Sequence, residues 1–298
     1  MSVYGLLKCP LCGGDLETDG KSLICTGRAR RHLYDFAATG YVNLLPPGKG
    51  KNARTGDDKQ MISARARFLD KGYYSFFSEK IGKVISAFAK DGSKAGIVLA
   101  DCACGEGYHT CNILKTIAEN GVTPHAVAFD ASKHGASYGS RRASRIPGTD
   151  AFFAAANIFD LPLKDGCADF ATSIFAPVAW DEMRRILKGD GVLIVASSGE
   201  RHLYELRELL YDEPREASGE VKHPSFFEEA GCETVSRHVR VEGNGTVKDL
   251  FFMTPFCYRT SREDFEKLSS VDALDVTVEV KLTYFRKPSQ SDGEGQSV

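Results

Sequence analysis

The 298-residue sequence has no segment that would insert into a membrane or direct secretion. No apolar run approaches the roughly 20 residues that a membrane-spanning helix needs. Residues 1–5 lack the basic start and the long apolar core of a secretion signal. No internal repeat is visible, which argues against a repeat architecture. We therefore predict a cytoplasmic protein that does not associate with membranes.

The sequence also gives no sign of a disulfide framework, although it contains nine cysteines. The cytosol keeps thiols reduced, so the placement of the cysteines matters more than their number. Three lie near the N-terminus, at Cys9, Cys12 and Cys25, and three more lie between residues 102 and 111. We interpret the other three, which are scattered, as small core residues.

A local excess of positive charge is hidden in an otherwise ordinary composition. Hydrophobic residues make up 42% of the chain and charged residues 26%, with a net charge of −2, as in many globular proteins. Residues 21–54, however, contain seven Lys or Arg and a single acid, Asp35. Such a patch suits a phosphate-rich partner, and an ordinary solvated surface explains it equally well. The candidate contacts to such a partner are Arg28, Arg30, Arg31, Lys49, Lys51 and Arg54.

Apolar and helical segments alternate from residue 96 onward. Strands joined by helices imply a parallel sheet with crossover helices. The predicted strands are 97–101, 125–130, 151–155, 168–174, 191–196, 234–241 and 276–285. The predicted helices are 59–71, 74–89, 108–119, 133–145, 179–187 and 261–270, the last with Thr260 and Glu263 as a capping box.

Composition divides the chain into four parts. Residues 1–36 form a small module with little core of its own, and residues 37–93 contain a basic, Pro- and Gly-rich linker followed by two helices. Residues 94–287 form the α/β domain. Residues 288–298 are rich in Ser, Gly and acid, which predicts a disordered tail.

The N-terminal cysteines have metal-binding spacing. Cys9 and Cys12 place two thiolates on one tight turn, Cys25 follows after a short predicted hairpin, and His32 supplies a fourth ligand. Thiolates with an imidazole favour zinc, and four protein ligands make the site structural. Such a site would stabilise a module too small to hold its own core. Six residues separate Cys25 from His32, where about three to five are usual, so free thiols or a redox pair remain the alternative.

The segment 101–108, DCACGEGY, directly follows the apolar run 97–100 and opens a predicted helix. A dinucleotide fingerprint needs a third glycine, and Thr110 occupies that position, which disfavours an NAD enzyme. The next strand ends in a second acid, Asp130. This arrangement resembles the signature of S-adenosylmethionine-dependent methyltransferases. The resemblance assigns Asp101 and its loop to the methionine end of the cofactor, and Asp130 to the ribose hydroxyls.

Two later segments agree with this resemblance. Asn157 follows the third strand, where such enzymes contact the adenine, although taken alone it is more simply a turn residue. Phe175 and Pro177 follow the fourth strand, where such enzymes place the reactive methyl, although core packing explains Phe175 equally well. Ala103 replaces the usual first glycine of the family. The implied cofactor contacts are Asp101, Ala103, Cys104, Gly105, Glu106, Gly107, Tyr108, Asp130 and Asn157.

In chain order, the motifs together closely resemble the bacterial 23S ribosomal RNA guanine-N1 methyltransferases. The cysteine motif is followed by YVNLLP at 41–46, GD at 56–57, CGEGY at 104–108, RHL at 201–203 and MTPF at 253–256. The resemblance implies a Rossmann-like class I methyltransferase fold, with a mostly parallel seven-stranded sheet and an N-terminal zinc-binding module. It also implies methyl transfer from S-adenosylmethionine to N1 of a guanine in a 23S rRNA hairpin loop, by a homodimer that forms a cleft for the RNA.

No residue in the sequence is an obvious general base, although guanine N1 must lose a proton in this reaction. Asp57, Phe175 and Pro177 are the candidates for a catalytic role. Proton acceptors could also be sought among Asp58, Glu106 and His109, each of which has a simpler role as a cap or surface residue. Two other functions stay open. One is a small-molecule methyltransferase with a zinc-stabilised lid, and the other is a non-catalytic RNA-binding protein that retains the fold.

Overall fold

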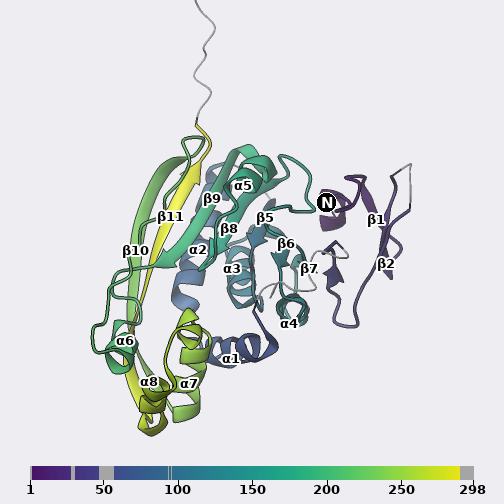
Figure 1. Ribbon diagram of the computed structural model, residues 1–298. Helices are drawn as coiled ribbons and strands as arrows, with labels where there is room; N and C mark the ends of the chain where they lie inside the picture. Colours follow the sequence, from purple (N-terminus) through teal and green to yellow (C-terminus); the bar gives the residue numbers. More distant parts are fainter. Residues whose placement is uncertain (1, 28–30, 47–56, 93, 95, 289–298) are drawn as a thin grey trace, which may run out of the picture.

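One large sheet with helices on both faces organises the described part of the chain, which is residues 2–27, 31–46, 57–92, 94 and 96–288 of a computed structural model (Figure 1). Within these residues the sheet has eight strands in the order β10–β11–β9–β8–β5–β6–β7–β4. Neighbours from β9 to β4 are parallel, whereas β11 is antiparallel to β9 and β10. The strands are β4 (Val42–Asn43), β5 (Gly96–Cys102), β6 (Thr123–Asp130), β7 (Asp150–Ala155), β8 (Ala168–Ile174), β9 (Leu187–Ser198), β10 (Glu228–Glu242) and β11 (Ala273–Arg286).

The predicted α/β fold with a mostly parallel sheet is confirmed. All seven predicted strands are present, and β4 adds an eighth at the edge beside β7, where Val42 pairs with Ala154 and Asn43 with Ala155. Residues 42–43 fall in the predicted linker, because a strand of two residues is too short to show the alternating pattern by which strands are recognised. Pairing with β7 fixes this segment to the sheet.

Helices connect the strands as expected, with two additions. The helices are α1 (Lys59–Leu69), α2 (Ser75–Asp91), α3 (Tyr108–Glu119), α4 (Lys133–Ala143), α5 (Trp180–Ile186), α6 (Tyr204–Leu210), α7 (Asn244–Phe252), α8 (Arg262–Glu266), and the 3-10 turns η1 (Val3–Leu6), η2 (Pro255–Tyr258) and η3 (Lys267–Ser270). Helices α6 and α7 were not predicted, because a short apolar run in a sequence is compatible with either a helix or a strand. None of the helices in the described ranges is long and apolar enough to cross a membrane.

The predicted capping box before α8 is wrong by one residue. Ser261 is the N-cap, and its hydroxyl accepts a hydrogen bond from the Asp264 amide at 3.1 Å. Thr260 instead lies outside the helix, with its hydroxyl 2.6 Å from that of Tyr211. Both residue types are good caps, so sequence alone does not choose between adjacent candidates.

Both faces of the sheet are buried, which follows from the alternation of side chains along a strand. In β5, Ile97 and Leu99 belong to the core that contains α2 and α3. Val98 and Ala100 belong to the opposite core, which contains α5 and the N-terminal segment. Because the faces are covered, the carboxyl ends of the strands are the part of the sheet open to a ligand.

The N-terminal module is a three-stranded antiparallel sheet, which lies beyond β7 in Figure 1, at the purple end of the chain. Its strands are β1 (Leu16–Thr18), β2 (Ser22–Cys25) and β3 (Leu33–Asp35). The Tyr4 ring packs edge-on against Phe36 at 5.8 Å and against Phe152 of β7 at 5.7 Å between centroids. The small module therefore shares the core of the large domain.

Candidate active site

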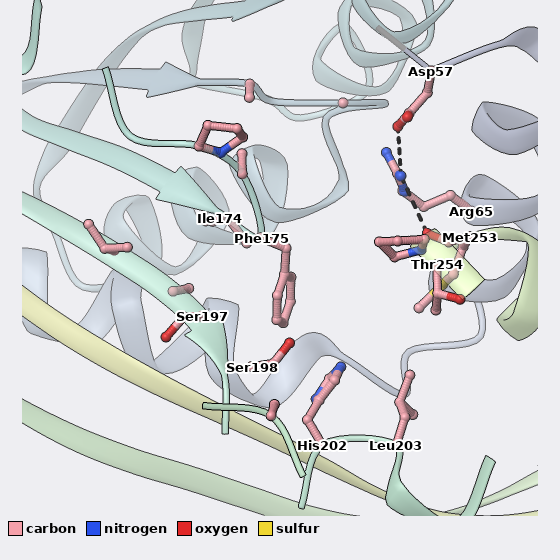
Figure 2. Close-up of a pocket in the computed structure, with 18 of the residues that line it drawn as sticks. Asp57, Arg65, Ile174, Phe175, Ser197, Ser198, His202, Leu203, Met253 and Thr254 are labelled. Carbon is pink, nitrogen blue, oxygen red and sulfur yellow. Dashed lines mark hydrogen bonds and ion pairs between the residues drawn. The ribbon is translucent and has the colours of Figure 1, made fainter. Parts of the chain in front are cut away.

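A cavity of about 1340 Å³ lies at the carboxyl ends of the parallel strands. Residues that follow β5, β6, β8 and β9 line it, together with residues of α1, α6 and the segment 253–259 (Figure 2). Ligands of open α/β sheets bind at this edge, where several loops converge. The predicted site residues that line the cavity are Asp57, Asp101, Ala103, Cys104, Gly105, Glu106, Asp130, Phe175 and Pro177.

The loop after β5 follows a left-handed backbone path. Ala103 has φ 70° and Gly105 has φ 55°. The amides of Ala103 and Cys104 both donate to the carbonyl oxygen of Phe129 in β6, at 2.8 and 2.9 Å. Glycine adopts this conformation without strain, whereas alanine pays roughly 1–2 kcal/mol. The loop is thus fixed to the neighbouring strand, and its glycine leaves room for a ligand to approach the backbone.

Asp130 ties the end of β6 to that loop. Its carboxylate accepts a hydrogen bond from the Gly105 amide at 2.8 Å and another from the Ser132 amide at 2.7 Å. Burial raises the pKa of the carboxyl group, while these two hydrogen bonds lower it. A carboxylate has about four acceptor positions, so two remain after these bonds. Asp130 can therefore accept hydrogen bonds from two adjacent ribose hydroxyls.

Asp101 lies at the floor of the cavity and is almost fully buried. One carboxylate oxygen accepts a hydrogen bond from the Thr172 hydroxyl at 2.9 Å, and the other accepts one from the Thr110 hydroxyl. Burial raises the pKa of Asp101 to about 6, although both hydrogen bonds lower it. The side chain thereby joins the first turn of α3 to β8 beneath the loop.

Two predicted cofactor residues, Gly107 and Tyr108, pack into the fold and do not line the cavity. A Cβ atom at Gly107 would lie 2.6 Å from the Cα atom of Gly139, so glycine allows α4 to approach α3 closely. The Tyr108 ring is buried, with the guanidinium carbon of Arg142 5.5 Å from its centroid. Their place in the motif reflects packing of the first turn of α3.

Asn157 also lies outside the cavity lining. Its side chain is exposed, and its amide oxygen accepts a hydrogen bond from the Phe159 amide at 3.1 Å. This is the turn-forming role that the sequence offered as the simpler explanation. The neighbouring Ile158 lines the cavity in its place and offers an apolar contact.

Arg65, on α1, lies in the cavity wall and was not among the predicted site residues. Its guanidinium forms an ion pair with Asp57 at 2.7 Å and donates to the Met253 carbonyl oxygen at 3.4 Å, as Figure 2 shows. Burial lowers the pKa of Arg65, but the nearby carboxylates of Asp57 and Glu106 raise it by more, so the pKa lies above its usual value. An adjacent cation and anion beside Gly105 match the charged groups of an amino acid.

An aromatic ring, that of Phe175, occupies the other side of the cavity. It is 40% exposed even though Tyr74, Phe77 and His202 surround it, with centroids 6.3, 5.8 and 5.3 Å away. Figure 2 shows the ring directed into the same space that Arg65 and His202 border. A large ring held by other rings and still open on one face suits stacking against a flat ligand.

Backbone strain is concentrated in this cavity. Across the described ranges, the non-glycine residues with positive φ are Ala103 at 70°, Phe175 at 51° and Leu203 at 54°, and all three line it. Such conformations persist where surrounding structure enforces them, and they cluster at functional sites. The strained residues therefore lie on both sides of the cavity: Ala103 follows β5, Phe175 follows β8 and Leu203 follows β9.

Among the proton-acceptor candidates, Asp58 has a structural role, because its side chain caps α1 by accepting the Met61 amide at 2.9 Å. His109 lies 2.8 Å from the Ser78 hydroxyl, and burial with the nearby Arg65 and Arg142 lowers its pKa to about 3. Burial also raises the pKa of Glu106, although Arg65 opposes this. Asp57 and Glu106 both line the cavity, and Asp57 forms a direct ion pair with Arg65.

The four predicted metal ligands, Cys9, Cys12, Cys25 and His32, come together in the N-terminal module. Their ligand atoms all lie within 4.8 Å of one another. The Sγ atoms of Cys12 and Cys25 are 3.3 Å apart, and His32 Nδ1 is 3.4 Å from the Sγ atom of Cys9. Three sulfurs and one nitrogen at this separation fit a tetrahedral zinc ion. The longer gap before His32 does not prevent convergence.

The neighbours of the cluster also suit a metal. The Tyr34 hydroxyl lies 3.1 Å from the Sγ atom of Cys9, and the Gly27 amide donates to the Sγ atom of Cys25 at 3.3 Å. Hydrogen bonds of this kind orient thiolate ligands. A Cβ atom at Gly27 would lie 3.1 Å from the Sγ atom of Cys12, so glycine fits closely against the thiols.

Of the predicted RNA contacts, Arg31 is described, and its side chain is exposed next to His32. Arg28, Arg30, Lys49, Lys51 and Arg54 lie outside the described residues, as does most of the predicted tail. The basic patch is therefore represented in the structure by Arg31 and Lys21, both on the surface of the small module.

The sheet, the glycine loop and the acid at the end of β6 define a class I S-adenosylmethionine-dependent methyltransferase, with a zinc ribbon at its N-terminus. Two family models agree: one described as "RlmA, N-terminal", a zinc ribbon, matches residues 7–54, and one described as "Methyltransferase domain" matches residues 93–247. The second covers more than half of the chain.

Relatives that match most of the chain identify the branch of that class. YxjB of Bacillus subtilis strain 168, whose assignment as a 23S rRNA (guanine-N1)-methyltransferase is itself provisional, is 30% identical over 94% of this chain and 96% of its own. The 23S rRNA (guanine(748)-N1)-methyltransferase of Streptomyces fradiae is 33% identical over 70% of this chain and 69% of its own. The chain belongs to the 23S rRNA (guanine-N1)-methyltransferase family.

Proposed function

We propose that the protein transfers a methyl group from S-adenosylmethionine to N1 of a guanine in a 23S rRNA hairpin loop. The observation that carries this proposal is the division of one cavity into a polar side beside Gly105 and an aromatic side around Phe175. The polar side suits a charged nucleoside cofactor, and the aromatic side suits an unstacked base. The relatives act, by name, on guanine N1 of 23S rRNA.

On the cofactor side, each residue has a distinct task in this proposal. Asp130 accepts the ribose hydroxyls, and the backbone of residues 103–105 lies along the methionine end. Arg65 and Asp57 face the carboxylate and the ammonium of that end. Asp101 holds the loop from below through its two threonines. Cys104 and Glu106 complete the wall.

The reaction needs orientation more than strong acid–base chemistry, because the leaving group is a neutral thioether. Bound S-adenosylmethionine supplies the methyl group: its sulfonium–carbon bond breaks as the carbon–N1 bond forms, the N1 proton leaves to water, and S-adenosylhomocysteine results. Phe175 stacks on the guanine and fixes its plane, while Pro177 shapes the turn that presents the ring. Asp57, a catalytic candidate from the sequence, is assigned in this proposal to the cofactor side through its ion pair with Arg65.

The zinc ribbon is proposed as the module that recognises the RNA. Residues 1–36 would present Arg31 and the other predicted basic residues to phosphates, residues 37–93 would connect this module to the cavity, and residues 94–287 would perform the transfer. Zinc bound by Cys9, Cys12, Cys25 and His32 would hold the module in shape. A phosphate-binding role gives affinity without sequence information.

We further propose a cytoplasmic homodimer that forms a cleft for the hairpin. The location follows from a ribosomal RNA substrate. The dimer is supported by the family resemblance and by β10, a 15-residue edge strand that pairs with β11 alone among the described strands. Light scattering on the purified protein, with and without the RNA hairpin, measures its mass directly, and a monomer under both conditions contradicts the dimer.

The function is tested with radiolabelled S-adenosylmethionine and unmodified 23S rRNA. We expect label in the RNA and none in mixtures of nucleosides or small metabolites. Label in small molecules but not in RNA would support the methyltransferase with a zinc-stabilised lid. Cofactor binding and RNA binding without any transfer would support a non-catalytic RNA-binding protein.

A further inference from the structure

Arg207 of α6 is a buried cation in the cavity wall. Its side chain is 8% exposed and lines the cavity. The guanidinium donates to the carbonyl oxygen of Arg215 at 2.5 Å and to that of His202. No carboxylate in the described ranges forms an ion pair with it. Burying a charge without a counter-ion is costly, so an arginine at such a place indicates a ligand that supplies negative charge.

The surroundings of Arg207 place it on the target side. Helix α6 follows β9, and the backbone oxygen that holds the guanidinium belongs to His202, whose ring lies 5.3 Å from that of Phe175. The Phe256 ring lies 5.9 Å from the guanidinium carbon. Arg65, beside Gly105, occupies the cofactor side and is already paired. Arg207 and Phe175 therefore line the same cavity, and His202 contacts both of them.

We propose that Arg207 recognises O6 of the target guanine and stabilises the negative charge that develops on O6 as N1 loses its proton. The inference rests on the proposed transfer to guanine N1. A guanidinium has five N–H donors, so the two backbone contacts leave donors for a carbonyl oxygen. As the N1–H bond breaks and its proton passes to water, the electron pair spreads from N1 to O6, and a cation at O6 lowers the barrier.

Two other anions are less suited to this position. The methionine carboxylate has Arg65 beside the glycine loop. A backbone phosphate stays hydrated and near the surface, whereas Arg207 is nearly closed off from solvent. A base edge, inserted after the nucleotide unstacks, reaches such a depth. If a phosphate were the ligand, loss of Arg207 would weaken every RNA equally, which the experiment below detects.

The test uses three RNA hairpins that differ at the target position. One carries guanosine, one carries inosine, which keeps O6 but lacks the 2-amino group, and one carries 2-aminopurine riboside, which keeps the amino group but lacks O6. Binding is measured with S-adenosylhomocysteine present. We expect the wild-type protein to prefer guanosine and inosine over 2-aminopurine by about tenfold, because a hydrogen bond to a charged group is lost. Arg207→Met should bind all three hairpins alike.

Turnover gives a second readout. Arg207→Met should lower kcat with guanosine by about 100-fold, the usual loss for one oxyanion donor, while S-adenosylhomocysteine binding stays unchanged. Arg207→Lys keeps a charge, should restore part of the preference, and serves where Arg207→Met fails to fold. Retained discrimination in both variants, or equal weakening of all three hairpins, would overturn the inference. Absence of methyl transfer by the wild-type protein would instead refute the proposed function.

Discussion

The two sides of the cavity differ in their chemistry. The cofactor side consists of a strained glycine loop and charged groups, Asp130 and the Arg65–Asp57 pair, whose hydrogen bonds are already formed. The proposed target side consists of rings around Phe175 and of Arg207, a buried cation for which the described residues provide no ion pair. The first is built for one ligand of fixed structure, and the second for a flat base. The proposed function therefore predicts that cofactor binding and target recognition are separable, and the variants below test that separation.

The largest expected effect concerns the zinc ribbon, which lies outside both sides. Zinc binding contributes about 10–16 kcal/mol to the folding of small zinc modules. Cys9→Ser removes one of the four ligands, so we expect the zinc to be lost. Methyl transfer to RNA should then fail while S-adenosylmethionine still binds, as metal analysis and calorimetry can measure. Cys232 is exposed on β10, so its interpretation as a core residue was wrong. Cys232→Ser is therefore the matched control and should keep its zinc. Full zinc content in Cys9→Ser would contradict the assigned ligands.

A large effect confined to the cofactor side is expected from Asp130→Ala. Loss of hydrogen bonds to a buried carboxylate should weaken S-adenosylmethionine binding by at least about 100-fold. RNA affinity should not change, and calorimetry and filter binding separate the two. Asp150→Ala, which removes the acid that pairs with His125 at the start of β7, is the control and should bind cofactor normally. Equal losses for both ligands would break the separation between the two sides.

On the target side, Phe175→Ala should reduce kcat/KM for RNA by about tenfold, because stacking of a base on an aromatic ring is worth roughly 1–3 kcal/mol. The dissociation constant for S-adenosylmethionine should stay the same. Phe159→Ala removes a ring that is 61% exposed and does not line the cavity, so it should have no effect on either ligand. Weaker cofactor binding by Phe175→Ala would mean that the ring belongs to the cofactor side and that our assignment is wrong.

The smallest effect is expected at Ala103. Its φ of 70° favours glycine, so Ala103→Gly should raise the free energy of unfolding by up to about 1 kcal/mol. Ala118→Gly in α3, where the backbone is helical, should lower it by about the same amount. Thermal unfolding of the two variants compares them. A destabilised Ala103→Gly would mean that the loop needs the methyl group for packing.

The two sides also differ in how far the sequence predicts them. The strand, the glycine loop and Asp130 lie within 35 residues of one another, so their spacing was enough to predict that the loop and Asp130 are neighbours. His202 and Arg207 join Phe175 in the cavity lining only after the chain has folded, and α6 was too short to recognise by its periodicity. Gly107, Tyr108 and Asn157 belonged to the motif, but the structure uses them for packing and a turn.

The N-terminal ligands show the opposite balance. Cys9, Cys12 and Cys25 were predicted from spacing, and the four ligand atoms converge despite the long gap before His32. Cysteine and histidine can be recognised as metal ligands from the residue type alone, and Cys9 and Cys12 lie on one local turn, so no knowledge of the fold was needed. What the sequence did not reveal is the contact of Tyr4 with Phe152, which joins the module to the large sheet.

The most direct test of the central claim is the identity of the methylated nucleoside. Unmodified 23S rRNA is incubated with the protein and S-adenosylmethionine, digested to nucleosides, and analysed by mass spectrometry, with primer extension to locate the stop. The account predicts one equivalent of 1-methylguanosine from a hairpin loop. Methylation at another atom of guanine, at another base, or no methylation with cofactor binding intact would contradict it.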